Sequence, residues 1–92
     1  MPRFYFHIYN GFGRAPDDEG RECDDTEEAR AIAVEGVRSL LSAEVLEGRL
    51  DLRGRIEVTG DDSRVVIVVP FKDALTVLSG PLPETSPREG SQ

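Results

Sequence analysis

The sequence contains few of the residues that most often signal a specialised chemistry or compartment. Its 92 residues include one cysteine, one histidine, one lysine and no tryptophan. A single cysteine cannot form an intramolecular disulfide, so an oxidising compartment is not indicated. The longest uninterrupted apolar run, residues 65–71, is far too short to cross a membrane. These absences and the chain length predict one cytoplasmic globular domain with no membrane partner.

Negative charge is present in excess, and it is concentrated in one stretch. The net charge is −7, and residues 17–28, here called the acidic segment, carry eight carboxylates against Arg21 alone. No basic run occurs, so direct binding to nucleic acid is disfavoured, because such binding needs a positive patch. Two interpretations of the segment remain: a solvated loop that leads into a helix N-terminus, or a docking surface for a basic partner.

Residues 3–9 have the composition and alternation of a β-strand. The segment is aromatic and β-branched, and a period of two places Phe4, Phe6 and Ile8 on one face and His7 with two tyrosines on the other. The Asn-Gly-Phe-Gly sequence that follows ends the strand, because Asn and Gly tolerate positive φ. Residues 14–23 predict a loop, with a short extended piece at residues 21–23.

A long helix is the clearest predicted element. Asp24 or Asp25 can cap it, with a glutamate three residues later as in a capping box, and Gly48 is a natural stop. Small and apolar residues recur at helical spacing between these ends. We expect an inward stripe formed by Ala29, Ala33, Gly36 and Leu40. In that stripe Gly36 would mark the closest approach to the sheet, so Gly36→Ala would destabilise the protein.

The second half of the sequence predicts a β-hairpin and a short final helix. Residues 55–59 and 64–71 are strand-like and flank a polar turn at residues 60–63. Pro70 cannot donate to a ladder, so the end of the last strand lies at a sheet edge or leaves the sheet. Apolar spacing over residues 71–78 indicates the short C-terminal helix.

These elements predict an α+β fold. A small antiparallel sheet, in the order β-loop-α-β-β, packs on one long helix, with a short C-terminal helix. Residues 1–78 form the single domain, and residues 79–92, rich in Pro, Ser and Gly, form a disordered tail.

No motif for catalysis, metal binding or cofactor binding is complete. Gly11 and Gly13 follow a strand, but no helix opens after them, as a dinucleotide fingerprint requires. The acidic segment does not fit a calcium loop either. His7 and Cys23 could form a nucleophile pair only if the loop folded Cys23 back beside the first strand. Nearby carboxylates would raise the pKa of the Cys23 thiol and so lower its nucleophilicity. We therefore predict no catalytic, metal or cofactor-binding residue.

The aromatic residues offer one candidate contact surface. It comprises Tyr5, His7, Tyr9 and Phe12. The alternative is that these side chains simply cover the second face of the sheet.

The sequence resembles a family of short uncharacterised bacterial proteins, a domain of unknown function. Members open with Met-Pro-Arg-(Phe/Tyr)-(Tyr/Phe)-Phe-His and end their hairpin with Pro-Phe-x-Asp-Ala, as residues 1–7 and 70–74 do here. Residues 18–20 supply the family's Asp-Glu-Gly step, and residues 26–30 begin its long Ala-rich helix. The resemblance implies no activity. A weaker likeness, to antitoxins of the HicB type, rests on Thr-Glu-Glu-Ala at residues 26–29, but no DNA-binding segment follows.

The functional expectation is a small non-catalytic interaction or regulatory module that has no cofactor and is not an enzyme. We expect an unknown protein partner and a homodimer, with no direct contact to nucleic acid. The alternative is an antitoxin-like protein that masks a basic RNA-cleaving partner, a role that the acidic segment would suit.

Overall fold

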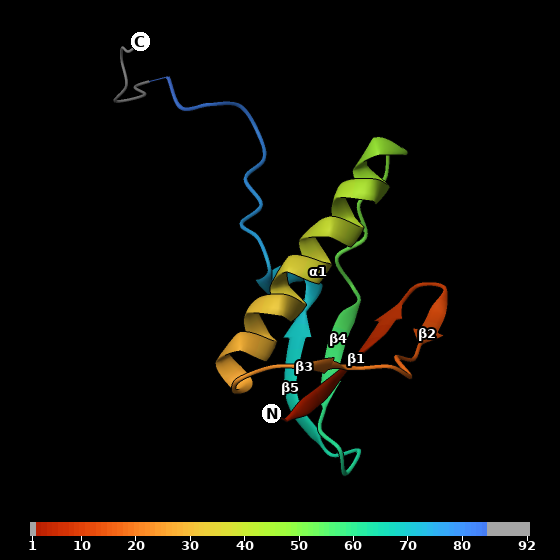
Figure 1. Ribbon diagram of the computed structural model, residues 1–92. Coiled ribbons are helices and arrows are strands. Elements are labelled where there is room, and N and C mark those ends of the chain that lie inside the picture. The colour runs from red at the N-terminus through yellow and green to blue at the C-terminus, as the bar shows by residue number, and fades with distance from the viewer. Residues whose placement is uncertain (1, 85–92) are drawn as a thin grey trace.

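The computed structural model describes residues 2–84, which form one long helix packed on an antiparallel sheet (Figure 1). The elements in chain order are β1 (Arg3–Asn10), β2 (Gly13–Ala15), β3 (Arg21–Glu22), α1 (Thr26–Leu46), β4 (Arg55–Thr59), β5 (Val65–Pro70) and the 3₁₀ turn η1 (Phe71–Asp73). The sheet order is β2-β1-β4-β5, and β3 pairs with the beginning of β1. The predicted α+β class is confirmed.

Both ends of α1 follow local sequence signals. Asp25 is the N-cap, and its Oδ1 accepts the Glu28 N–H at 2.9 Å, while Glu28 Oε1 accepts the Asp24 N–H at 2.6 Å. At the other end Gly48 has φ +86° and the Arg49 N–H bonds to Glu44 O at 3.2 Å, which is a Schellman termination.

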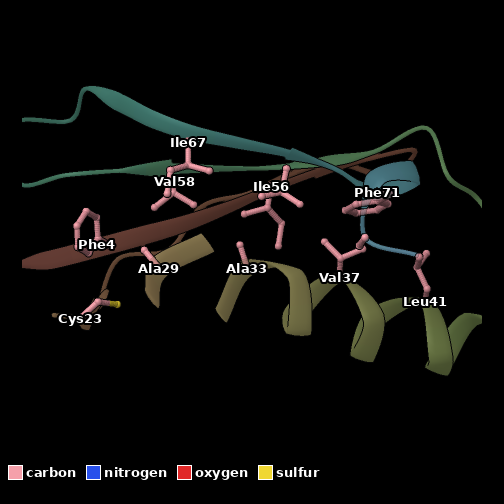
Figure 2. Packing of buried hydrophobic residues seen from close by; sticks show 12 residues of the cluster. Phe4, Cys23, Ala29, Ala33, Val37, Leu41, Ile56, Val58, Ile67 and Phe71 are labelled. Atoms are coloured by element: carbon pink, nitrogen blue, oxygen red, sulfur yellow. The ribbon is translucent and has the colours of Figure 1, made fainter. Parts of the chain in front are cut away.

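The core lies between α1 and one face of the sheet (Figure 2). On β4 and β5, alternate residues such as Ile56, Val58 and Ile67 point toward the helix, and Phe4 does so from β1. Val69 of β5 is buried in the same core. The inward helix residues are Ala29, Ala33, Val37 and Leu41. Small residues at the start of this row bring the helix close to the sheet.

The prediction for Gly36 is wrong. Gly36 is exposed, and a Cβ atom built there would meet only Ile56 Cδ1, at an ordinary contact distance of 3.7 Å. The inward row runs through Val37 instead, because α1 packs against β4 and β5 and therefore turns Gly36 away from them.

The predicted C-terminal helix is reduced to η1. Phe71 and Ala74 are buried as the spacing requires, but one 3₁₀ turn suffices for that. Leu78 is 89% exposed, so no packing supports a longer helix, and Thr76 and Val77 are poor helix formers. Of the predicted tail, residues 79–84 form no helix or strand, and residues 85–92 lie outside the described residues.

Two short strands lie in the stretch predicted as a loop. β2 pairs with the end of β1, and β3 confirms the extended piece expected near residue 21. β2 has three exposed residues and no alternation of polarity, so its sequence carries no strand signal. Within residues 2–84, no helix combines the length and apolar character that a bilayer crossing needs.

Candidate functional site

The sheet face opposite α1 carries the predicted contact residues of β1. Tyr5, His7 and Tyr9 lie on this open face, because the helix-facing residues of β1 alternate with them. On β4, Thr59 pairs with Tyr5, and Glu57 pairs with His7. The structure therefore brings three of the four predicted contact residues together on one half-buried surface.

His7 has a bonding partner at each ring nitrogen. Nδ1 accepts the backbone N–H of Asp17 at 3.1 Å, and Nε2 lies 3.0 Å from Thr59 Oγ1. Since Nδ1 acts as an acceptor, the proton of the neutral ring is on Nε2, which donates to the Thr59 hydroxyl. In this state neither nitrogen of His7 is free to act as a general base.

Cys23 lies on the other side of the sheet from His7. It is fully buried in the helix-facing core beside Phe4 and Ala29 (Figure 2). Burial, together with the nearby Glu28 carboxylate, raises the pKa of the Cys23 thiol, which lowers its thiolate fraction. The structure does not bring Cys23 and His7 together as a nucleophile pair.

Asp17 organises this region, and sequence reasoning did not single it out. Its Oδ2 accepts the backbone N–H of Phe6 at 3.0 Å, and its Oδ1 accepts those of Glu19 and Gly20, each at 3.1 Å. Burial raises the pKa of the Asp17 carboxyl, but these N–H groups outweigh burial and hold the pKa below its ordinary value. A usable signal was present, since Asp at the first and Gly at the fourth position favour a type I turn, and an Asp side chain often accepts the N–H two residues on.

Tyr9 is flanked by two arginines on the open face. Arg14 of β2 and Arg55 of β4 are its direct cross-strand partners. Their guanidinium carbons lie 5.5 Å and 4.2 Å from the Tyr9 ring centroid, and Arg14 Nε donates to the Tyr9 hydroxyl at 2.8 Å. These cation–π contacts connect β2, β1 and β4 across the sheet.

Arg14, Tyr9 and Arg55 also line a hollow of about 590 Å³, together with Arg53. Arg55 is bound to Glu57 at 2.8 Å and Arg53 to Asp51 at 2.9 Å. Two of the three arginines that line the hollow are therefore paired with carboxylates.

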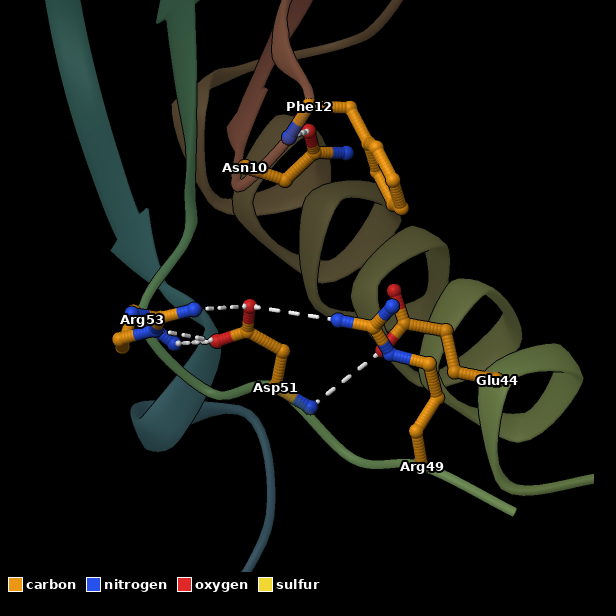
Figure 3. A network of polar contacts seen from close by, with 6 residues as sticks. All are labelled: Asn10, Phe12, Glu44, Arg49, Asp51 and Arg53. Carbon is orange, nitrogen blue, oxygen red and sulfur yellow. Dashed lines mark hydrogen bonds and ion pairs between the residues drawn. The ribbon is translucent and has the colours of Figure 1, made fainter. Parts of the chain in front are cut away.

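Phe12 departs from the predicted contact surface. It is 81% exposed at the tip of the β1–β2 turn, where its backbone N–H bonds to Asn10 Oδ1 at 2.8 Å. Its ring lies 5.5 Å from the guanidinium carbon of Arg49, which follows α1, so it faces the C-terminal end of the helix (Figure 3).

Asp51 joins the end of α1 to the start of β4 (Figure 3). Its carboxylate holds Arg53 through two hydrogen bonds of 2.9 Å and lies 3.9 Å from Arg49. Arg53 holds the pKa of the Asp51 carboxyl well below its usual range. The Asp51 N–H donates to Glu44 Oε1 at 3.4 Å, so the network connects the C-terminal part of α1 to the segment that leads into β4.

The profile of one protein family, a domain of unknown function (DUF6894), matches residues 3–72 of the chain. The chain belongs to this family. The match begins with β1 and ends inside η1, so it includes α1, all five strands and the Asp17 loop. Neither the curated proteins nor the solved structures include a match to the chain.

The DUF6894 domain presents most of its carboxylates to solvent. Within the acidic segment, Asp17 is half-buried and the other seven carboxylate residues are exposed. Across residues 2–84, no three His, Cys, Asp or Glu side chains are grouped closely enough to hold a metal ion.

Proposed function

We propose that this DUF6894 domain is a non-catalytic interaction module that accepts a strand of a partner protein along β5. The observation that carries the proposal is the apolar surface of this edge strand. β5 ends the sheet order, and Val65, Val66 and Val68 remain 45%, 45% and 43% exposed. An apolar edge without charged residues along its length is a template for strand addition.

The backbone of β5 supports this proposal. The Phe71 N–H donates to Gly54 O at 2.9 Å, and the register pairs Ile56 with Val69. Because ladder bonds alternate along an antiparallel strand, Val69 also bonds toward β4, and Val68 directs its N–H and C=O outward. Pro70 occupies an outward position, where its missing N–H costs no ladder bond.

A second copy of the chain is the partner that fits this edge. Two β5 strands can pair antiparallel about a two-fold axis at Val68, where each Val68 N–H meets the other C=O. The Val68 side chains then pack against each other on the open face, and the two sheets become one. The homodimer extends the Tyr5, His7 and Tyr9 surface without needing any further element.

Sedimentation equilibrium tests this function. The wild-type chain should sediment at twice its mass of 10.1 kDa, and Val68→Lys should return it to that mass. Val77→Lys, which adds the same charge at an exposed valine outside the sheet, should leave the dimer intact. Two results together would contradict the proposal. The wild-type chain would sediment at 10.1 kDa even at high concentration, and Val68→Lys would retain the same lysate partners as the wild type.

A cysteine cross-link tests the register. In a hydrogen-bonded antiparallel pair the Cα atoms lie about 5.5 Å apart, a separation that a disulfide spans. Val68→Cys should therefore oxidise to a covalent dimer, whereas Val66→Cys, displaced from the two-fold axis, should cross-link far more slowly. Native Cys23 is buried and does not compete. Equal rates for the two variants would rule out pairing centred on Val68.

The antitoxin-like role is a second candidate, favoured by the exposed carboxylates of the acidic segment. A protein that masks a basic RNA-cleaving partner needs such a surface. The discriminating observation is a short reading frame for a basic protein beside the gene. Its purified product should lose RNA cleavage when this domain is added, and unchanged cleavage would reject the role.

A further inference from the structure

The hollow beside Tyr9 is lined by cations and by uncharged residues. Its volume of about 590 Å³ falls within the range of small-molecule sites, about 300–1,000 Å³. Three of its lining residues are the arginines Arg14, Arg53 and Arg55. The others are Tyr9, Asn10 and three glycines, so the lining contributed by residues 2–84 includes no carboxylate. A ligand in this hollow therefore meets three guanidinium groups.

The register of the sheet holds two of these arginines together. Arg14 of β2 and Arg55 of β4 are both paired with Tyr9, and directly paired residues of antiparallel strands point to the same face. Their guanidinium carbons lie 5.5 Å and 4.2 Å from the Tyr9 ring centroid. Three neighbouring strands thus place two cations beside one aromatic ring.

Both arginines retain donors that no other group uses. Arg14 donates through Nε to the Tyr9 hydroxyl, and Arg55 donates through Nε to Glu57, each at 2.8 Å. Within residues 2–84, no hydrogen bond involves the Nη atoms of Arg14 or Arg55. A guanidinium group carries five N–H donors in a planar fork, so each has donors left for the oxygens of an anion.

The ion pairs around the hollow leave an excess of positive charge. Asp51 is shared between Arg53 at 2.9 Å and Arg49 at 3.9 Å, so two arginines meet one carboxylate (Figure 3). Among the described residues, no carboxylate lies within ion-pair distance of Arg14. Counted with Arg55 and its carboxylate partner, four arginines meet two carboxylates, which is an excess of two positive charges.

We propose that this hollow binds a small molecule through a phosphate monoester group. Such a group carries a charge of about −1.5 to −2 at neutral pH, which matches the excess, and its oxygens accept from guanidinium forks. A nucleic acid is not the ligand, because the net charge of −7 repels a long polyanion. The inference goes beyond the proposed function. No residue that lines the hollow belongs to β5, so Val68→Lys should leave this binding unchanged.

Phenyl phosphate, phenyl sulfate and benzyl alcohol are matched probes, because they carry a dianionic, a monoanionic and an uncharged group on the same ring. Each is titrated at pH 7.5 into the ¹⁵N-labelled chain and followed by NMR. Phenyl phosphate should bind most tightly and shift the Nε–H signals of Arg14 and Arg55. Phenyl sulfate should bind more weakly, and benzyl alcohol should not bind. Inorganic phosphate should bind more weakly than phenyl phosphate, because it leaves most of the hollow empty.

Arg14→Gln tests the arginine that has no carboxylate partner. It should weaken the binding of phenyl phosphate about tenfold or more, since a charge-assisted hydrogen bond is lost. The matched control Arg30→Gln, at an exposed position of α1, changes the net charge equally and should bind as the wild type does. Circular dichroism and the urea midpoint confirm that each variant is folded.

Glu57→Gln tests the site through a gain of affinity, which a misfolded protein cannot produce. It frees Arg55 from its carboxylate partner and should strengthen the binding of phenyl phosphate. Glu35→Gln, at an exposed position of α1, changes the net charge equally and should have little effect.

Four results would each overturn the inference. The first is that phenyl phosphate binds no better than benzyl alcohol. The second is that Arg14→Gln binds phenyl phosphate as tightly as Arg30→Gln does. The third is that Glu57→Gln and Glu35→Gln have the same affinity, which would make the attraction one of net charge alone. The fourth is that inorganic phosphate binds as tightly as phenyl phosphate, because the ligand would then be the free ion and not an ester.

Discussion

At the scale of single residues, the carboxylate of Asp17 takes the place of a neighbouring strand for the middle of β1. On this side of β1, β3 pairs with Arg3 and Phe4, and β2 pairs with residues 8–10. The Phe6 N–H lies between these pairings and donates to Asp17. One side chain therefore closes a gap in the sheet and shapes the loop that leads into β3.

We predict that Asp17→Asn destabilises the protein by about 1–3 kcal/mol, because three charge-assisted bonds to backbone N–H groups, two of them part-buried, are lost. The amide places an NH₂ group against donors that need an acceptor. The urea midpoint at unchanged slope measures the effect. Asp18→Asn, at an exposed neighbour, should change stability by less than about 0.5 kcal/mol. Equal midpoints for the two variants would contradict the role assigned to Asp17.

The same residue predicts a pH dependence. The pKa of Asp17 is lower in the folded protein than its ordinary value, so the carboxylate stabilises the fold fully above the unfolded pKa. This contribution is lost as the pH falls through the folded pKa. The stability difference between wild type and Asp17→Asn should therefore be constant near neutral pH and shrink below about pH 4. Asp51 titrates in both proteins, so its contribution cancels in the stability difference. A stability difference between wild type and Asp17→Asn that persists in acid would show that another group is responsible.

At the scale of the element, α1 has clear ends but a rotation that its own sequence leaves undecided. Gly36 is exposed, and a methyl group fits there at ordinary contact distance. We therefore predict that Gly36→Ala stabilises the protein by about 1 kcal/mol, the helix propensity difference. Urea unfolding measures this change in stability. A Gly36→Ala protein that is less stable than the wild type would instead support the close contact that the sequence predicted.

Gly48 provides the contrasting case on the same helix. Its φ of +86° is one that side chains with a Cβ atom disfavour, although open space surrounds it. Gly48→Ala should therefore destabilise by about 1–2 kcal/mol, through the backbone alone. Urea titrations of the two variants should give changes in unfolding free energy of opposite sign. The gain at Gly36 reports helix propensity, and the loss at Gly48 reports the positive φ.

At the scale of the whole molecule, Gly54 is the point where β1, β4 and η1 meet. A Cβ atom there would clash with the carbonyl oxygen of Tyr9 and approach Phe71 Cε2 to 2.5 Å, and the Gly54 carbonyl holds the Phe71 N–H. We predict that Gly54→Ala destabilises by about 1–3 kcal/mol through overpacking. Gly60→Ala, whose nearest atom is Asp62 Oδ1 at 3.6 Å, is the matched control. Similar urea midpoints for the two variants would refute the close approach.

The surfaces of the molecule were only partly predictable. A period of two correctly placed Tyr5, His7 and Tyr9 on one face, because alternation is a local property of any strand. Phe12 left that surface because it lies in the turn after β1, where alternation no longer applies, and its ring is near Arg49, which follows α1. The binding of His7 to Thr59, 52 residues away in the sequence, also has no local signal.

The sequence by itself determined the elements whose causes are local. These are the alternation of β1, the capped start and glycine stop of α1, the polar turn of the β4–β5 hairpin, and the placement of all net charge in residues 17–28. Only the tertiary structure decided which row of α1 faces inward, that residues 13–15 form a strand, and that Gly36 is exposed instead of closing a contact. The reason is physical: rotation, short edge pairings and grooves depend on where distant segments lie, and a helix with apolar residues on two adjacent rows can bury either one.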